Sequence, residues 1–144
     1  MHSKKAVTIS VPVYWHRRNP TSTTFRYHEY YLSETKEYYK YYYTLFEELA
    51  SEYIDKVRIG LDGQYIRRCM SAIERELFMS PKGRTTRDMC STIDEICNDD
   101  KFKPWFTFKN INKNVSSNYL KLICFAIKCG ICFPVVFMHN LLMK

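Results

Sequence analysis

The sequence predicts an all-α fold, a small helical bundle that ends in a hydrophobic helix. Apolar residues recur at spacings of three and four in several stretches, which is typical of amphipathic helices. The 144 residues include only four glycines, and 46% are hydrophobic. This composition excludes a disordered or linker-rich chain. From Leu122 to Leu142 the chain carries a single charged side chain, Lys128. At this length one domain is expected.

Residues 1–23 are expected to form an irregular N-terminal arm, and residues 24–108 a helical domain. Within the arm, Val7–Val11 alternates like a short strand, but Pro12 and Pro20 keep it short. The strongly periodic part of the chain begins only after this arm.

The first helix of the domain is predicted over Ser33–Val57. Ser33 is a suitable N-cap, and Glu34 and Glu37 place negative charge in the first turns, where the helix dipole favours it. Tyrosines make the apolar face wide and partly polar. The residues of this face are Tyr38, Tyr42, Leu45, Leu49 and Tyr53, with Phe46, Ala50 and Val57 beside them.

Two further helices are predicted, separated by turns. A turn is expected at Gly60–Gly63, followed by a second helix over about 64–79. Ser80–Gly83 contains proline and glycine, which fit a tight turn, so the chain should break again there. A third helix should follow over about 85–97.

The C-terminal third divides by polarity. Residues 102–108 are aromatic with an internal proline, and a short helical or irregular segment packed by Trp105 is expected. Residues 109–118 are predicted to be a polar linker. Residues 119–144 are predicted to form one hydrophobic helix, capped by one of the two serines at the end of that linker.

The hydrophobic helix has two interpretations, a membrane anchor or the central core helix of a compact bundle. Its apolar stretch would cover about 30 Å, the thickness of a bilayer core. Its apolar side chains contribute on the order of −3 to −7 kcal/mol to insertion, and Lys128 opposes this by about 2.5 to 3.5 kcal/mol. The balance marginally favours an anchor. The expected anchor residues are Leu122, Ile123, Phe125, Ile127, Ile131, Phe133, Val135, Val136, Phe137, Leu141 and Leu142.

The chain is basic, with a net charge of +7 and an isoelectric point of about 9.1. Such a charge suits nucleic acid or an anionic membrane surface. The third helix, however, carries Arg84 and Arg87 beside Asp88, Asp94 and Glu95. A recognition helix pressed against phosphates should not be this acidic, which disfavours nucleic acid as a partner.

No motif in the sequence suggests catalysis, a metal site or a cofactor. There is no nucleophile elbow, phosphate-binding loop or histidine pair at metal-ligand spacing. Cys129 and Cys132 form a C-x-x-C pair, but no second pair supplies the other ligands that zinc needs. Acidic pairs such as Asp99–Asp100 are interpreted as solvated charge. We therefore expect a protein that is not an enzyme, in reducing surroundings.

Three short stretches carry a family resemblance. Asn114–Ile123 reads NVSSNYLKLI, and Met79–Pro81 and Ile96–Asp100 lie upstream of it. At this spacing they resemble poxviral apoptosis inhibitors of the Bcl-2 family, in which the first stretch joins the domain to a tail anchor. The resemblance covers roughly residues 60–144. It lacks the Asn-Trp-Gly-Arg signature whose arginine meets the ligand's aspartate in cellular members.

The resemblance implies an all-α bundle around a hydrophobic central helix. A surface groove would bind the amphipathic death-motif helix of pro-apoptotic host proteins, and the tail would hold the bundle on the mitochondrial outer membrane, facing the cytosol. The expected function is inhibition of host apoptosis by helix-in-groove recognition. Two arginines could replace the missing signature arginine. The expected groove residues are Tyr42, Leu45, Phe46, Leu49, Arg67, Arg68, Met70 and Ile73.

Two alternatives remain open. One is a soluble, cytoplasmic helical interaction module that modulates host innate signalling, with the hydrophobic last helix as its core. Deleting residues 119–144 should unfold such a chain, whereas an anchored domain should stay folded without its tail. The other is a basic nucleic-acid-binding helical domain, which would show a strongly salt-dependent affinity for DNA.

Overall fold

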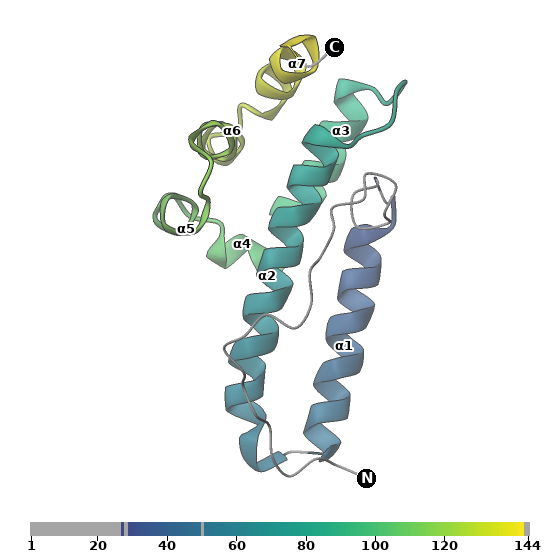
Figure 1. Ribbon diagram of the computed structural model, residues 1–144, viewed down its shortest axis with the longest axis vertical. Helices are drawn as coiled ribbons and strands as arrows, with labels where there is room; N and C mark the ends of the chain where they lie inside the picture. The colour runs from purple at the N-terminus through teal and green to yellow at the C-terminus, as the bar shows by residue number, and fades with distance from the viewer. Residues whose placement is uncertain (1–26, 28, 50, 143–144) are drawn as a thin grey trace, which may run out of the picture.

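The computed structural model describes residues 27, 29–49 and 51–142. The predicted N-terminal arm, residues 1–23, lies outside the described residues. The described part of the chain forms a small helical bundle in which no strand occurs (Figure 1). The predicted all-α class is therefore confirmed.

Helices α1 (Tyr31–Leu49) and α2 (Ile54–Phe78) form an antiparallel pair joined by a short 3-10 turn, η2 (Ser51–Tyr53) (Figure 1). The predicted helix over Ser33–Val57 and the predicted turn at Gly60–Gly63 are both wrong. The chain reverses before Ile54, and both glycines lie inside a continuous helix of 25 residues. Neither has the positive φ that a glycine turn would need.

Helix α3 (Thr86–Cys97) starts where the sequence predicts. The Thr85 hydroxyl accepts a hydrogen bond from the Asp88 backbone N–H (3.1 Å), and the Asp88 carboxylate accepts one from the Thr85 N–H (3.2 Å). This reciprocal capping box satisfies two backbone donors that the first turn leaves free. Gly83, with φ of 98°, provides the left-handed turn before it.

The segment predicted as a polar linker is largely helical. After the short helix α4 (Phe102–Trp105), helix α5 spans Phe108–Asn114, and the Thr107 hydroxyl caps it by accepting from the Asn110 N–H (3.3 Å). Ile111 is the reason that this polar stretch packs, because its side chain is fully buried. A single buried residue in a helix of two turns is too weak a pattern to stand out in the sequence.

The single hydrophobic helix predicted over 119–144 is also wrong. Helix α6 (Asn118–Lys128) and helix α7 (Cys132–Leu142) are separate, because the chain turns at Gly130 with φ of 78°. Ser117 caps α6, as the sequence suggested, by accepting from the Leu120 N–H (3.3 Å). Within the described ranges, no helix has the length and apolar character needed to cross a membrane.

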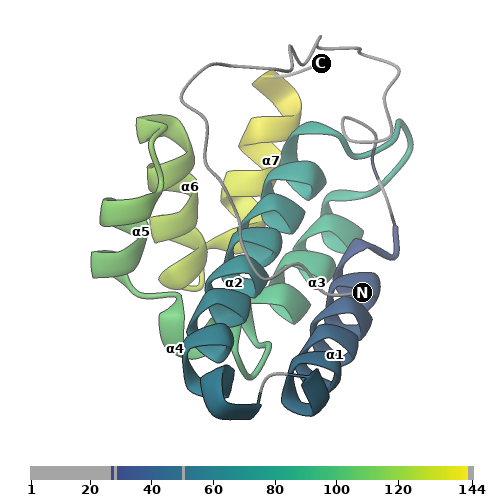
Figure 2. The ribbon, with the colours of Figure 1, turned by 60° about the horizontal axis from the view of Figure 1, so that its bottom comes forward.

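The core lies around the C-terminal half of α2. Figure 2 shows α2 at the centre, with α1 and α3 to one side and α4, α5 and α6 to the other. Buried side chains on α2 begin only at Tyr65, and α1 buries a single residue, Thr35. The far half of the α1–α2 pair therefore projects beyond the core. The largest fully buried apolar side chains are Phe102, Phe106, Ile73, Met89, Ile93, Ile96, Ile111 and Val136.

Candidate helix-binding groove

The structure does not bring the eight predicted groove residues together. Between α1 and α2 lies a crevice of about 40 Å³, which Tyr42 and Arg68 help to line. Ile73 is fully buried and belongs to the core. The others separate into two groups. Leu45, Phe46 and Leu49 lie on the projecting half of α1, and Arg67 and Met70 line a different cavity.

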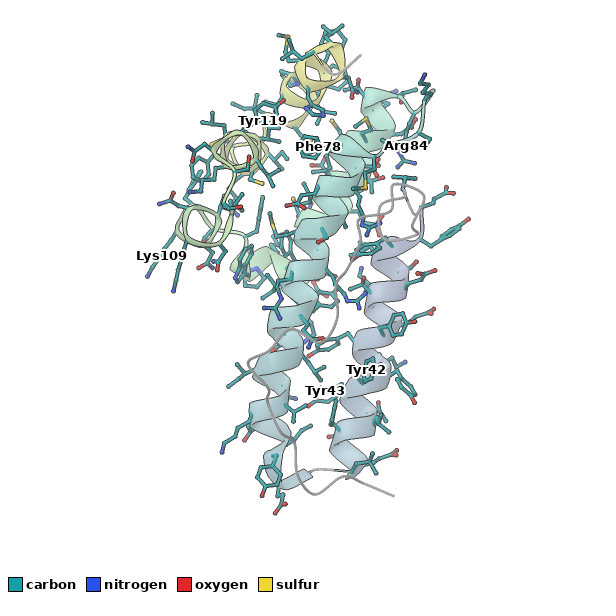
Figure 3. The ribbon with its side chains drawn as sticks, in the orientation of Figure 1. Tyr42, Tyr43, Phe78, Arg84, Lys109 and Tyr119 are labelled. Carbon is teal, nitrogen blue, oxygen red and sulfur yellow. The ribbon has the colours of Figure 1, made fainter. Side chains whose placement is uncertain are left out.

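The α1–α2 contact is closed because tyrosines fill it. Tyr39 packs edge-on against Tyr65 with ring centroids 5.2 Å apart, and its hydroxyl donates to an Asp62 carboxylate oxygen (2.6 Å). Further along α1, Tyr42 stacks on Phe46 at 6.4 Å. Tyr42, labelled in Figure 3, is 41% exposed. It therefore lies on the surface of the helix pair and does not line a deep groove.

A cavity of about 470 Å³, the α2 groove, lies on the opposite side of α2. Such a volume falls within the range of protein ligand pockets, about 300 to 1,000 Å³. Its walls come from α2, α4 and the segment that joins α5 to α6. The lining residues are Gly63, Ile66, Arg67, Met70, Ser71, Glu74, Trp105, Asn114, Val115, Ser116, Ser117 and Leu120.

Helical spacing explains why α2 supplies half of this lining. Gly63, Arg67, Met70 and Glu74 are separated by three or four residues, so they share one face of the helix. Across the groove, Trp105 is held by its ring contact with buried Phe102, with centroids 5.6 Å apart. The groove is therefore formed by a rigid helix on one side and an aromatic wall on the other.

The charges at the groove are a cation and an anion on α2. Arg67 and Glu74 are both exposed, and within residues 27, 29–49 and 51–142 neither takes part in an ion pair. Loss of hydration around the Glu74 carboxyl raises its pKa. Arg68, by contrast, lies over the Tyr38 ring, 5.7 Å from its centroid. Only the first of the two predicted arginines lines the groove.

A buried carboxylate that the sequence suggested was solvated joins α1 and α2 to α4. Asp99 accepts hydrogen bonds from the Tyr65 hydroxyl (2.8 Å) and from the backbone N–H of Phe102 (3.1 Å). The Lys36 ammonium lies 3.2 Å from the same carboxylate, and the Asp99 side chain is 8% exposed. Burial alone would raise the pKa of Asp99, but these hydrogen bonds outweigh burial and lower it.

A second buried acid fixes the other end of α2. The Glu76 carboxylate accepts from Arg84 Nε (2.6 Å), and Arg84 also donates from Nη2 to the Thr92 hydroxyl (2.6 Å). Burial raises the pKa of Glu76, and the arginine opposes that shift. The pair ties α2 to the loop before α3 (Figure 3). Removing either partner would leave a buried charge uncompensated.

His139, expected within a membrane tail, is instead a buried link between three helices. Its Nε2 lies 2.8 Å from the Leu77 carbonyl oxygen, and its Nδ1 lies 2.8 Å from the Tyr119 hydroxyl. A carbonyl only accepts, so Nε2 donates, and Nδ1 accepts from Tyr119 in the neutral imidazole. The Phe78 ring packs edge-on against it at 5.0 Å. These contacts hold α7 against α2 and α6.

The expected anchor residues divide between core and surface. Ile123, Ile127 and Val136 are buried, and Phe125 and Val135 pack against the core. The remaining six are exposed. These are Leu122, Ile131, Phe133, Phe137, Leu141 and Leu142.

Most of the cysteines are buried in the core. Among the described residues, no three His, Cys, Asp or Glu side chains gather as metal ligands would. Burial raises the pKa of Cys69, Cys97 and Cys124 to about 12, so these thiols stay protonated near neutral pH. The buried cysteines therefore serve as small apolar core residues.

The fold and the groove define a small all-α bundle with an open, partly apolar groove along its longest helix. No protein-family model, curated protein sequence or solved structure matches this chain. The Bcl-2-like resemblance therefore stays a prediction. The sequence shows the residue types of the α1 tyrosines, the α2 groove and the buried acids, but it does not show their contacts. Those contacts depend on which helices meet.

Proposed function

We propose that this protein is a helix-binding interaction module and that its α2 groove receives an amphipathic helix of a partner. Following the resemblance, the partner is a death-motif helix of a pro-apoptotic host protein, and its capture inhibits host apoptosis. The observation that carries the proposal is the open groove of about 470 Å³, lined by Arg67 and Glu74, neither of which is in an ion pair with another described residue.

The groove has the composition that helix recognition needs. The apolar residues of its lining are Ile66, Met70, Trp105, Val115 and Leu120, and the remainder is glycine, serine, asparagine and the two charged residues. An amphipathic helix presents apolar anchors at positions i, i+3, i+4 and i+7 along one face. Two turns of such a helix extend about 10 Å, which is also the rise between Arg67 and Glu74 along α2.

Arg67 is the residue that we assign to the ligand's aspartate. It is exposed at the groove and has no ion-pair partner in the described part of the chain. Glu74, two turns further along the same face, suits a basic residue of the bound helix. In this assignment the bound helix contacts the α2 groove and not the predicted residues of α1, and Arg68 is not part of the site.

A second candidate function uses the same groove without a membrane tail. Ile123, Ile127 and Val136 are buried in the bundle, and a segment that fills the core is not free to enter a bilayer as one span. This favours a helical module that captures a partner helix in host innate signalling. The two candidates differ in the identity of the bound helix.

Peptide binding to the full-length protein tests the proposal. Fluorescence anisotropy with labelled death-motif peptides should give saturable binding that Arg67→Glu weakens by about tenfold or more, because it replaces attraction with repulsion. Arg68→Glu is the matched control, since its side chain faces α1, and it should leave the affinity within about twofold. Equal weakening by both variants, or no effect of Arg67→Glu, would overturn the assignment.

A further inference from the structure

The net positive charge of this protein comes from its C-terminal third. The whole chain has 22 basic and 15 acidic residues. Residues 101–144 contain seven lysines and no acidic residue, which leaves residues 1–100 with 15 of each sign. The entire net charge of +7 therefore comes from the segment that forms α4 to α7. The helices α4 to α7 therefore bring lysines to the surface without any acidic residue of their own.

The same segment exposes a continuous apolar helix face. On α7, every exposed residue between Cys132 and Leu142 is apolar, and these residues follow helical spacing. Phe133 and Phe137 stack in parallel with centroids 6.3 Å apart, and they are 55% and 46% exposed. The exposed face consists of Phe133, Pro134, Phe137, Met138, Leu141 and Leu142. Apolar faces of this kind on a protein surface usually mark an interaction site.

Helices α5 and α6 precede α7 in the chain and carry exposed lysines. The three helices α5, α6 and α7 follow one another along one side of the bundle (Figure 1), with α6 in contact with both neighbours. Phe108 and Leu122 are exposed, and Lys109 and Lys113 extend from α5, the first pointing away from the bundle in Figure 3. Lys121 is partly exposed on α6.

We propose that the α5–α7 face docks in the plane of an anionic lipid membrane surface. Phe133, Phe137 and Leu141 would enter the boundary between headgroups and acyl chains, and the lysines would contact anionic headgroups. The proposal rests on a surface distinct from the proposed peptide site, so either can fail alone.

The geometry favours lying on the membrane over crossing it. Helices α6 and α7 have 11 residues each, or about 16 Å, against about 30 Å of hydrocarbon. An interfacial helix buries its apolar face about 5–10 Å into the boundary between headgroups and acyl chains, with basic residues beside that face. Lysine side chains are long enough to reach the headgroups while their methylene groups stay on apolar surface.

Charge also argues against a second copy of this chain as the occupant. A symmetric pair formed through this face would bring the lysines of both copies together with no acidic residue of residues 101–144 to compensate them. An anionic membrane supplies the missing negative charge. An anionic membrane surface therefore matches both the exposed apolar residues of α7 and the lysines of α5 and α6.

Vesicle cosedimentation of the full-length protein tests this. Binding to vesicles of phosphatidylcholine with about one third phosphatidylserine should exceed binding to pure phosphatidylcholine, and raised salt should weaken it. Each lysine near the surface contributes about fivefold, so Lys109→Gln, Lys113→Gln and Lys121→Gln together should reduce partitioning on the order of 100-fold. The matched control variant carries the same replacement at three exposed lysines elsewhere, Lys40, Lys56 and Lys82. Its partitioning onto vesicles should fall far less.

The apolar contribution has its own control. Phe133→Asp with Phe137→Asp should abolish vesicle binding, whereas Ile59→Asp, at a 75% exposed position on the projecting half of α2, should not. Circular dichroism must show that each variant stays folded. The proposal would be overturned by equal binding to both lipids or by an equal loss of vesicle binding in the control variants. It would also be overturned by resistance of the bound protein to extraction at high pH, or by self-association through α7 in place of vesicle binding.

Discussion

Replacing the buried carboxylate of Asp99 tests how the bundle holds the wall of the α2 groove. In Asp99→Asn the side chain keeps its shape but loses its charge. One oxygen can still accept from the N–H of Phe102. The amide nitrogen would face the Tyr65 hydroxyl and the Lys36 ammonium, which lie 2.8 and 3.2 Å from the oxygen that it replaces.

The expected cost follows from these contacts. A hydrogen bond to a charged group contributes about 1.5 to 3 kcal/mol, and the ion pair with the 46% exposed Lys36 adds less than about 1 kcal/mol. We therefore expect Asp99→Asn to lower the free energy of unfolding by about 2 to 4 kcal/mol. At roughly 3 °C per kcal/mol for a chain of this length, Tm should fall by about 6 to 12 °C.

The effect should depend on pH with a definite sign. The pKa of Asp99 is lowered in the folded state, so the unfolded chain binds its proton first as pH falls. The stabilisation is complete above the unfolded pKa of about 4 and is lost as pH falls through the folded value. Thermal melts followed by circular dichroism at pH 7 and pH 3 should show the gap between wild type and Asp99→Asn narrowing in acid.

Asp100→Asn is the control, because the neighbouring residue is exposed. Its Tm should stay within about 2 °C of wild type. If Asp99→Asn were as stable as wild type at pH 7, or if the gap did not change with pH, the charged hydrogen-bond site at the end of α3 would be refuted.

Three further predictions concern the helices that the sequence misplaced. Gly60→Ala should raise the free energy of unfolding, measured in urea titrations, by about 0.5 to 1 kcal/mol, because Gly60 is helical and an added Cβ meets nothing within 4 Å. Gly130→Ala should lower it, because Gly130 has a φ of 78°. A loss of stability in Gly60→Ala would indicate a turn at that position. Removing residues 130–144 should abolish cooperative unfolding, because α7 buries Val136 and His139 in the bundle, and an unchanged melt would indicate a dispensable tail. His139→Leu should cost about 1 to 3 kcal/mol in the same titration, since the Leu77 carbonyl loses its donor, and a neutral result would contradict the buried link.

Local sequence signals predicted the parts of the fold that local physics decides. The start of the third helix near residue 85 and a serine cap before residue 119 were both predicted. In the structure they are set by short-range hydrogen bonds, the capping box at Thr85 and the cap at Ser117. The Gly60–Gly63 turn failed because a glycine in a helix interior costs only about 1 kcal/mol. Tertiary packing of the C-terminal half of α2 overrides that penalty.

The site was less predictable than the fold because it depends on which helices meet. The apolar stripe predicted on α1 is largely exposed, since Tyr38 and Leu49 are 53% and 60% exposed, and it is Tyr39 that packs against Tyr65 of α2 and closes the helix pair. Trp105 was expected to pack, and nothing in its neighbourhood indicated that it forms a groove wall. Long-range contacts of this kind leave no periodic signal in the sequence.

The central claim is that Arg67 in the α2 groove meets the acidic residue of a bound helix. A double-mutant cycle tests it most directly, with the peptide aspartate changed to lysine and Arg67 changed to glutamate. We predict a coupling free energy of about 1 to 2 kcal/mol, with the doubly changed pair recovering affinity that each single change loses. A coupling of zero at Arg67, or the same coupling at Arg68, would contradict the account.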